Sequence, residues 1–519
     1  MKKIYVLISG ILMLTTVSCK KSFINLTPED TPAPGNFYKN ESQLRLGVTA
    51  AYAPLQSLEN YDYFMNEMRS DNTHYQPYPS NVGTAYVQRE NISDWVDDPT
   101  NTYTNNEYFT CYTGISRANI VINSIPNVTS LSASAKNDID GQVKFLRAFY
   151  YFKLVRLFGG VPLYLKPVSS ANDAFLPRSS VDQVYAQIIA DAQDAVNELT
   201  APAKFPQSGQ ATKGSATMLL AEVYMTMNPR KYADAETLLT SLAGMGYGLN
   251  ANYADAFDPK NKNSKESLFE VQYLEGLTST SQPSNFIYQF LPRTTDPSVI
   301  TGTGTKGNTA SIGGWNTPTP DLISSYEPGD KRLDASIGVA EGTYSNDMMT
   351  ITANKSIVNY TAPNGKVGVP YIKKYLHLPH VAFNNTNDNW PIYRYADALL
   401  LLAEAQNEQG KTGPAIINLN TVRARAGLAG TTATDQASLR SAILHERRVE
   451  LAFENHRWND LVRTGTALSV MTAYAAKAKT TYSYLPTNAF NITQERLLFP
   501  IPESERETNP KLTQNPGYF

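Results

Sequence analysis

Histidines are the first residues to consider for chemistry, because they bind metals and transfer protons. His445 and the glutamate after it begin like the zinc-binding helix H-E-x-x-H, but Val449 stands where the second histidine is required. His377 and His380 are three residues apart, yet Pro379 between them argues against a helix that presents both. With five histidines and two cysteines in the chain, we predict no metal site.

Motifs for cofactors and nucleophiles are also missing. Gly302, Gly304 and Gly307 fit G-x-G-x-x-G, but the strand before and the amphipathic helix after, which a dinucleotide site requires, are not evident. We therefore expect a loop there and no cofactor. The nucleophile motif G-x-S-x-G is absent from the sequence. A carboxylate pair for glycoside hydrolysis stays open, because its separation of roughly 5–10 Å is set by the fold.

The string from Glu446 to Glu450, Glu-Arg-Arg-Val-Glu, has the residue types of a catalytic site. On a helix the two glutamates lie side by side. Forked ion pairs between arginines and carboxylates of neighbouring helices explain the string better than catalysis does. We predict a structural role for it, and we expect Arg457 and Trp458 in the core of the same helical element.

Cys19 is a candidate for covalent lipid attachment. It follows two lysines, an apolar run over residues 4–14 and the small residues 15–18, which is typical of a secretory signal peptide. The run is too short to span a bilayer, which takes about 20 residues. A cysteine at this place resembles a bacterial lipobox, and we therefore predict cleavage after residue 18 and a lipid anchor on Cys19. The alternative is an ordinary secreted protein cleaved near a cysteine.

The composition is that of a globular protein with an ample core, since 42% of the 519 residues are hydrophobic and 18% are charged. Loss of residues 1–18 reduces the 45 basic residues by two, against 47 acidic ones, which argues against a nucleic-acid partner. Cys111 is predicted to be a small buried hydrophobe in a helix. The 32 tyrosines suit carbohydrate and protein surfaces alike.

Much of the sequence outside the irregular stretches has the periodicity of α-helices. Apolar residues recur on one helix face over 139–157, and Ser180 with Gln183 forms a capping box that opens another helix. Two helix–turn–helix segments, at 219–242 and 401–422, have alanine at the crossing, as in tetratricopeptide repeats of roughly 34 residues. The alternative is two unrelated helical hairpins.

We predict an all-α protein of tetratricopeptide-like hairpins with a large loop-rich insertion. An extended leader is expected over 19–40, and a single domain over 41–519. This domain is helical over 41–275 and 389–519, whereas residues 276–388 are rich in Thr, Ser, Asn, Gly and Pro. Loops on a stable scaffold commonly carry binding residues.

Several stretches, in order along the chain, carry a resemblance to a known family. They are the leader up to Phe37, KFLRAFYYFKLVRLFGGVP at 144–162, YRYAD at 393–397, HERRVELAFENHRWNDLVRTG at 445–465, LFPIP at 498–502 and NPKLTQNPGYF at 509–519. Together they resemble the SusD/RagB family of outer-membrane nutrient-binding lipoproteins over nearly the whole chain.

The resemblance implies four tetratricopeptide-like hairpins under a variable, loop-rich face. It also implies a protein of the cell exterior that captures nutrient, usually glycan, for a SusC-like TonB-dependent transporter, without catalysis. Acidic residues often follow the lipidated cysteine in exported members, whereas Lys20 and Lys21 follow it here.

A glycan is held by flat aromatic rings under its apolar face and by polar groups around its hydroxyls. The loops at 71–108 and 276–320 supply both, and the predicted ligand-binding residues are Asp71, Tyr75, Tyr78, Tyr86, Trp95 and Trp315. Packing within the loops is the alternative for any one of them. Peptides instead of glycans, an all-helical glycoside hydrolase and a pure interaction scaffold remain alternative functions.

Overall fold

The computed structural model describes residues 37–304 and 312–518. The predicted signal peptide, Cys19 and most of the predicted leader lie outside these residues. The α-helices are α3 (Glu41–Tyr52), α4 (Pro54–Leu58), α5 (Asp62–Asn66), α6 (Thr84–Ser93), α7 (Thr102–Ser124), α8 (Ala133–Phe158), α9 (Ala171–Ala174), α10 (Val181–Glu198), α11 (Lys213–Thr226), α12 (Tyr232–Gly244), α13 (Phe286–Phe290), α14 (Ser298–Thr301), α15 (Pro320–Ser325), α16 (Lys331–Ser336), α17 (Tyr395–Glu408), α18 (Thr412–Arg425), α19 (Gln436–Glu450), α20 (Arg457–Arg463), α21 (Ala467–Thr481) and α22 (Glu503–Thr508). The strands are β1 (Thr73–His74), β2 (Ser267–Val271), β3 (Thr317–Pro318), β4 (Ile337–Ser345), β5 (Met348–Ser356), β6 (Val367–Ile372) and β7 (Trp390–Arg394).

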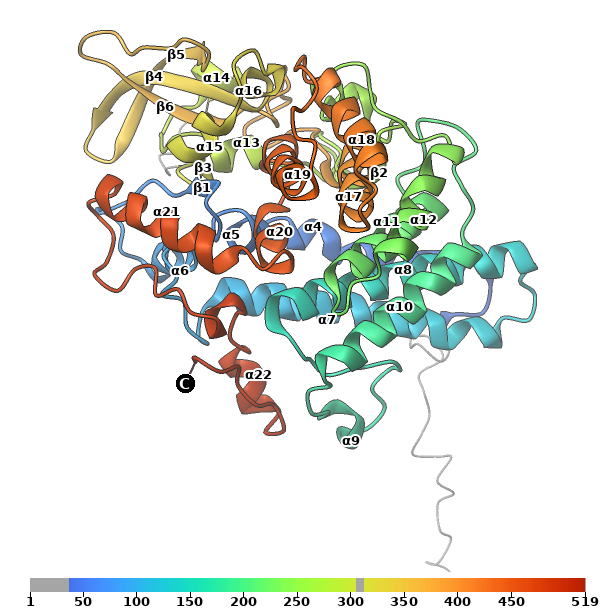
Figure 1. Cartoon of the computed structure of the whole chain (residues 1–519). Coiled ribbons are helices and arrows are strands. Elements are labelled where there is room, and N and C mark those ends of the chain that lie inside the picture. Colours follow the sequence, from blue (N-terminus) through green and yellow to red (C-terminus); the bar gives the residue numbers. More distant parts are fainter. Residues whose placement is uncertain (1–36, 305–311, 519) are drawn as a thin grey trace, which may run out of the picture.

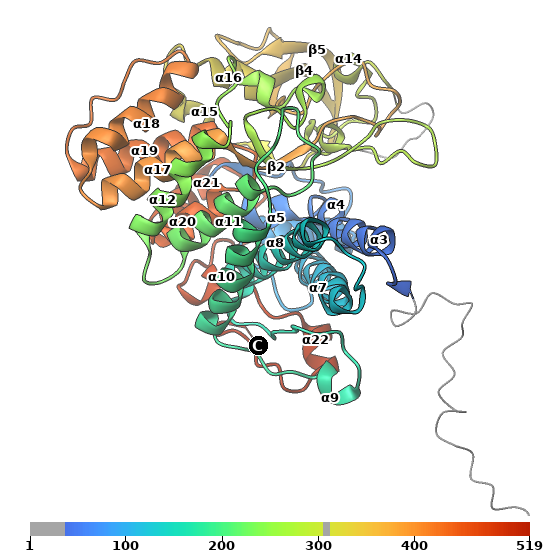
Figure 2. The ribbon, with the colours of Figure 1, turned by 90° about the vertical axis from the view of Figure 1, so that its right-hand side faces the viewer.

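The long helices pack in series (Figures 1 and 2). α7 contacts α8, α8 contacts α10, and the contacts continue through α11, α12, α17 and α18. The two predicted hairpins, α11–α12 and α17–α18, are distant in sequence but adjacent in space, because α12 packs against α17. This helical array confirms the predicted all-α, tetratricopeptide-like fold class.

Local sequence signals explain the ends of these helices. α8 buries the predicted face, including Ile139 and Leu154, and ends at Gly159, whose φ of 73° suits a residue without a side chain. The predicted capping box at the start of α10 is present, since Ser180 and Gln183 each bond the other's backbone N–H. Both helices therefore begin or end where the sequence predicts.

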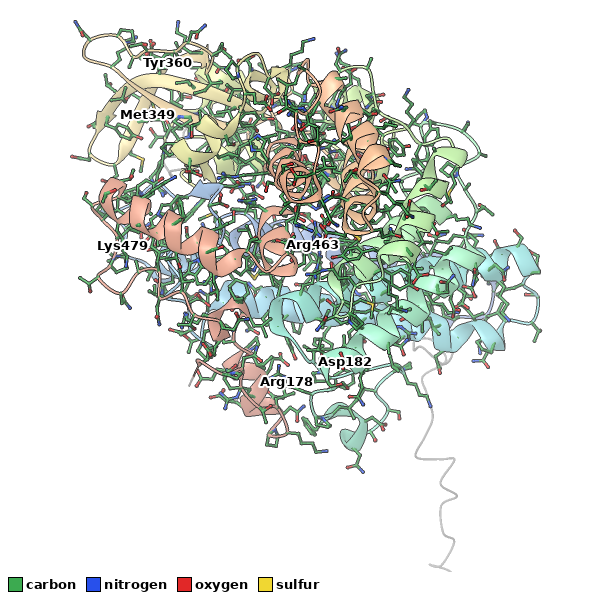
Figure 3. The ribbon with its side chains drawn as sticks, in the orientation of Figure 1. Arg178, Asp182, Met349, Tyr360, Arg463 and Lys479 are labelled. Carbon is green, nitrogen blue, oxygen red and sulfur yellow. The ribbon has the colours of Figure 1, made fainter. Side chains whose placement is uncertain are left out.

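The segment 276–388 holds short helices and a three-stranded antiparallel sheet, in which β4 lies between β5 and β6. This sheet lies at the upper left of Figure 1, and Met349 and Tyr360 mark it in Figure 3. It has a small hydrophobic core of its own, made by Ile287, Tyr288, Leu291, Ile300, Ala340, Met349, Ile351 and Tyr371. The insertion is thus a packed unit on the helical array.

Two short strand pairs connect the insertion to the rest of the chain. β2 pairs antiparallel with β7, so the chain leaves the array at Val271 and returns at Trp390, directly opposite. β1 pairs antiparallel with β3, with Thr73 opposite Pro318. The second pair brings the segment after residue 71 beside the segment around residue 315.

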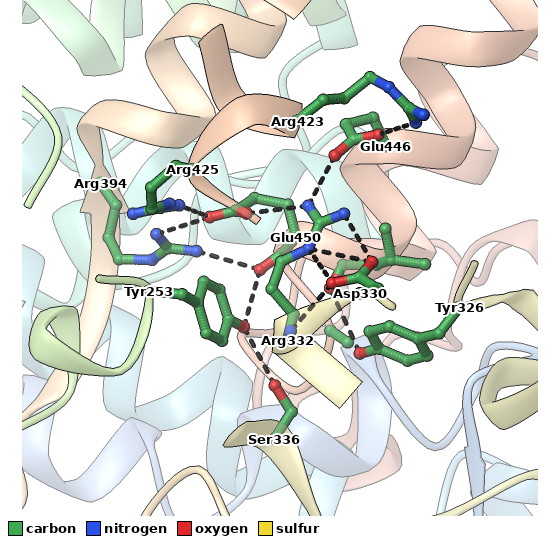
Figure 4. Close-up of polar contacts among 12 residues, drawn as sticks. Tyr253, Tyr326, Asp330, Arg332, Ser336, Arg394, Arg423, Arg425, Glu446 and Glu450 are labelled. Carbon is green, nitrogen blue, oxygen red and sulfur yellow. Dashed lines mark hydrogen bonds and ion pairs between the residues drawn. The ribbon is translucent and has the colours of Figure 1, made fainter. Parts of the chain in front are cut away.

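The charged string on α19 is structural, as predicted. Glu446 and Glu450 are completely buried, and both pair with Arg332 of α16. Glu450 also pairs with Arg394 and Arg425, so it lies among three guanidinium groups (Figure 4). These ion pairs connect α19 to α16, α18 and β7.

Two further predictions about the core are confirmed. Trp458 on α20 is 1% exposed, and Cys111 is a buried free thiol on α7. Burial raises the pKa of the Cys111 thiol well above its ordinary value, which keeps it protonated and unreactive. Among the described residues, no helix has the length and apolar character that crossing a membrane requires.

Candidate functional site

A cavity of about 310 Å³ opens where α5, α6 and α7 meet residues 285–293, which include α13, and the loop at 312–315. Its lining combines aromatic rings (Tyr61, Tyr63, Phe64, Tyr86, Tyr103, Tyr288 and Trp315), amides (Asn60, Asn285, Gln289 and Asn384) and two guanidinium groups (Arg89 and Arg293). Apolar walls with a few convergent polar groups are typical of a binding site for a small molecule.

A stacked pair of rings forms one side of this cavity. Tyr86 and Trp315 lie with their ring centroids 5.7 Å apart and their planes at 30°. Trp315 is only 4% exposed and packs edge-on against Phe64, whereas Tyr86 is half-buried. The pair can therefore offer a flat apolar face that is held in place from behind.

Backbone geometry places Trp315 in this position. Gly313 and Gly314 have φ of 76° and 86°, and a Cβ on Gly313 would come within 2.2 Å of the carbonyl oxygen of Leu291. The N–H of Gln76 donates to the Gly314 carbonyl oxygen at 2.7 Å. Only glycine fits the close approach at residue 313, so the turn presents Trp315 to the cavity.

Helix α6 supplies both Tyr86 and Arg89, which are three residues apart in sequence and therefore neighbours on one face of the helix. The Arg89 guanidinium carbon lies 4.9 Å from the Trp315 ring centroid, and Nε donates to the Tyr103 hydroxyl at 2.5 Å. On the other side, the Arg293 guanidinium carbon lies 4.3 Å from the Tyr78 ring centroid. Both cations are thus held against aromatic faces.

None of the described residues that line the cavity carries a carboxylate. Glu90 on α6 is a neighbouring acid. Burial raises the pKa of Glu90 to about 7, although attraction to Arg293 lowers it. Because Glu90 is largely protonated below neutral pH, it offsets the charge of the two arginines only in part.

Two family models together cover most of the chain. The model described as "SusD family" matches residues 223–518, and the model described as "Starch-binding associating with outer membrane" matches residues 31–225. The chain belongs to the SusD family.

Relatives of this SusD-family chain match along most of their length. "SusD-like protein P38" of Formosa agariphila is 29% identical, over 96% of either chain. "Starch-binding protein SusD" of Bacteroides thetaiotaomicron is 22% identical, over 73% of this chain and 72% of that protein. The solved structure of a "Laminarin binding SusD-like protein" superimposes with a TM-score of 0.73 at 26% identity, covering 93% of this chain and all of that one. The second and third of these relatives are named for binding, and the family is one associated with the outer membrane.

Among the six predicted ligand residues of this SusD-family chain, Tyr86 and Trp315 line the cavity. Tyr78 packs edge-on against Tyr86, with 5.3 Å between ring centroids, and its ring faces the Arg293 guanidinium. The structure therefore brings these three residues together, and their contact with a ligand stays a prediction.

The prediction of Trp95 as a stacking residue is wrong, because its side chain has no exposed surface. Its Nε1 donates to the Arg69 carbonyl oxygen at 3.2 Å, its ring meets Trp458 edge-on, and the Arg69 guanidinium lies 4.0 Å from its centroid. Trp95 is therefore a core residue, packed between groups of the protein itself.

Asp71 and Tyr75 are also corrected, since both are buried and satisfied inside the protein. Asp71 is 3% exposed and accepts hydrogen bonds from Nε and Nη2 of Arg457 at 2.7 and 2.8 Å. Burial alone would raise the pKa of Asp71, but Arg457 and Arg448 lower it below its ordinary value. The Tyr75 hydroxyl donates to Asp94 at 2.8 Å. Arg457 therefore has the structural role predicted for it.

The two arginines of the cavity were not predicted from the sequence. Arg89 has a weak sequence signal, because it lies one helical turn after Tyr86 within an aromatic-rich segment. Arg293 follows Leu291 and Pro292 in a stretch without periodicity, and nothing near it in sequence separates it from a surface arginine. Its position depends on contacts with residues 76–86, about 200 positions away.

Proposed function

We propose that the protein captures an oligosaccharide in this cavity and passes it to a SusC-like TonB-dependent transporter. It is anchored in the outer membrane by lipid on Cys19 and faces the cell exterior. The starch-binding and laminarin-binding relatives support a glycan as the ligand.

The stacked Tyr86–Trp315 pair carries the proposal. A pyranose ring has an apolar C–H face that packs on such a pair, and hydroxyl groups around its rim. Around the rings, the Asn384 side chain and the Oδ1 of Asn60 make no hydrogen bond with other described residues. These groups can pair with sugar hydroxyls without losing a bond inside the protein.

We propose binding without hydrolysis, and the composition of the same lining supports this proposal. Glycoside hydrolysis generally requires two carboxyl groups on either side of the scissile bond. The described lining residues supply amides, phenols and guanidinium groups, and none of them is Asp or Glu. A sugar held on Tyr86 therefore meets hydrogen-bond donors and acceptors but no acid–base pair.

Replacing Tyr86 tests the proposed site. Wild-type protein is first screened on an array of neutral and acidic oligosaccharides, and the tightest ligand is then titrated by calorimetry. We expect Tyr86→Ala to weaken binding by about tenfold, because a stacked ring contributes on the order of 1 kcal/mol or more. The melting temperature should stay close to the wild-type value, because Tyr86 is half-exposed.

Phe109→Ala is the matched control, since Phe109 is an aromatic residue of α7 that is 62% exposed at a different hollow of the surface. Loss of affinity in Phe109→Ala with full affinity in Tyr86→Ala would place the site elsewhere. Absence of binding by wild-type protein to any glycan would overturn the proposed function.

A further inference from the structure

Arg293 differs from the other buried arginines of this protein. Eight arginines are buried in the described part of the chain, and seven of them form ion pairs with Asp or Glu. Arg293 is 1% exposed and forms no ion pair with any described residue. A buried cation without a counter-charge is costly, so its presence at the cavity calls for an explanation.

The contacts of Arg293 leave donors unused. Its Nη2 donates to the carbonyl oxygen of Gln76 at 2.9 Å, its buried Nε has no hydrogen-bond partner, and Nη1 makes no bond with the described residues. Gly314 permits this arrangement, since a Cβ there would come within 2.6 Å of Nη2. The guanidinium carbon also lies 5.5 Å from the ring centroids of both Tyr86 and Trp315. Arg293 is therefore held beside the stacked pair with donors to spare.

Arg89 adds a second positive charge at the same rings. It too forms no ion pair within the described residues, and only its Nε has a bonding partner, Tyr103. The cavity is therefore locally cationic in a chain with a formal net charge of −2.

The geometry points to an acidic sugar as the ligand: its anionic group pairs with Arg293 and Arg89 while its ring packs on the Tyr86–Trp315 pair. This inference rests on the proposed function, because it assigns the chemical class of the captured glycan. A planar guanidinium binds a carboxylate or a sulfate through paired N–H donors, so uronic acids and sulfate esters share the required chemistry. An anion supplies to Arg293 the counter-charge that the protein supplies to its other buried arginines.

Paired oligosaccharides that differ only in charge test the inference. Galacturonic acid oligomers are compared with their carboxyl-reduced counterparts, and sulfated galactan oligosaccharides with their desulfated counterparts, by calorimetry at low salt. We expect at least one acidic member to bind tenfold or more tightly than its neutral counterpart. The pair that shows this preference identifies the anion as carboxylate or sulfate.

Arginine variants assign the preference to the cavity. Arg293→Met should remove it, whereas Arg117→Met, an exposed arginine outside the cavity on α7, should retain it. Arg89 is half-buried, and Arg89→Met is a second variant in case Arg293→Met does not fold. Arg89→Met should lower the affinity for acidic ligands at least threefold. The inference is overturned if the neutral and acidic members bind equally well, or if both Arg293→Met and Arg89→Met keep the preference for the acidic member. Either result leaves the proposed glycan capture intact. Failure of every glycan to bind overturns the proposed function itself.

Discussion

Replacing Glu450 with Gln should destabilise the protein far more than a surface change of the same kind. Glu450 is completely buried and accepts hydrogen bonds from Arg332 and Arg394 at 3.0 Å each, and from Arg425. Burial alone would raise the pKa of its carboxyl, but these three guanidinium groups lower it to about 2. Removing its charge leaves three buried cations with one counter-charge fewer.

The magnitude follows from two independent routes. A pKa lowered from 4.5 to about 2 corresponds to about 3 kcal/mol at 1.36 kcal/mol per unit. Breaking a buried ion pair by removing one partner typically costs about 3–5 kcal/mol. Because the pKa is depressed, this contribution is fully present above about pH 4.5 and is lost as the pH falls towards 2. The penalty of Glu450→Gln should thus be constant between pH 5 and 8, as conditions of measurement, and shrink in more acidic solution.

Urea unfolding at pH 7 measures the loss, and calorimetry should show a melting temperature lower by roughly 3–5 °C for a chain of this length. Glu408→Gln is the control, because Glu408 pairs with Arg440 at the surface, and surface pairs contribute about 1 kcal/mol or less. If Glu450→Gln costs no more than Glu408→Gln, the ion pairs in Figure 4 do not stabilise the fold, and the structural role assigned to α19 is wrong.

Three other changes separate stability, binding and anchoring. Burial raises the pKa of Glu107 to about 8, so the folded state loses stability as the pH rises from about 4.5 to 8. Glu107→Gln should therefore raise the melting temperature more at pH 9 than at pH 5. An equal change at both pH values would refute this. Trp95→Ala should lower the free energy of unfolding by about 3–5 kcal/mol in urea titrations while the folded protein keeps its glycan affinity. Cys19→Ala should move the protein out of the membrane fraction on cell fractionation, and retention there would exclude a lipid anchor on this residue.

Local signals were sufficient to predict α8 and α10, whereas the prediction of a loop over 71–108 is wrong where α6 (Thr84–Ser93) and the start of α7 lie. The stripe that α8 buries and the cap at Ser180 depend on residues within one or two turns, so they can be read from the sequence alone. The packing of α12 on α17 could not be read in this way, because the insertion separates the two hairpins along the chain. Whether a segment forms a helix depends mainly on residues near it in sequence, whereas the helix that it packs against depends on the whole fold.

The site was predicted less well for the same reason. Trp95 and Trp315 look alike in sequence, each beside polar residues in an irregular segment. Arg69 and Trp458 enclose the first on both sides, and Trp458 comes from the far end of the chain. Arg293 was missed because its distinguishing feature is a buried charge that no carboxylate of the described residues pairs with. The groups that bury it, such as Gln76 and Tyr78, are distant in sequence.

The β2–β7 ladder has an evolutionary consequence. Because Val271 and Trp390 are paired, residues 272–389 begin and end at one point of the helical array. Doubling the length of such a loop costs only about 0.6 kcal/mol in chain entropy. The stretches that supply Arg293 and Trp315 can therefore vary in length between relatives and change ligand preference, provided that Arg332 keeps its ion pairs with Glu446 and Glu450 of the array.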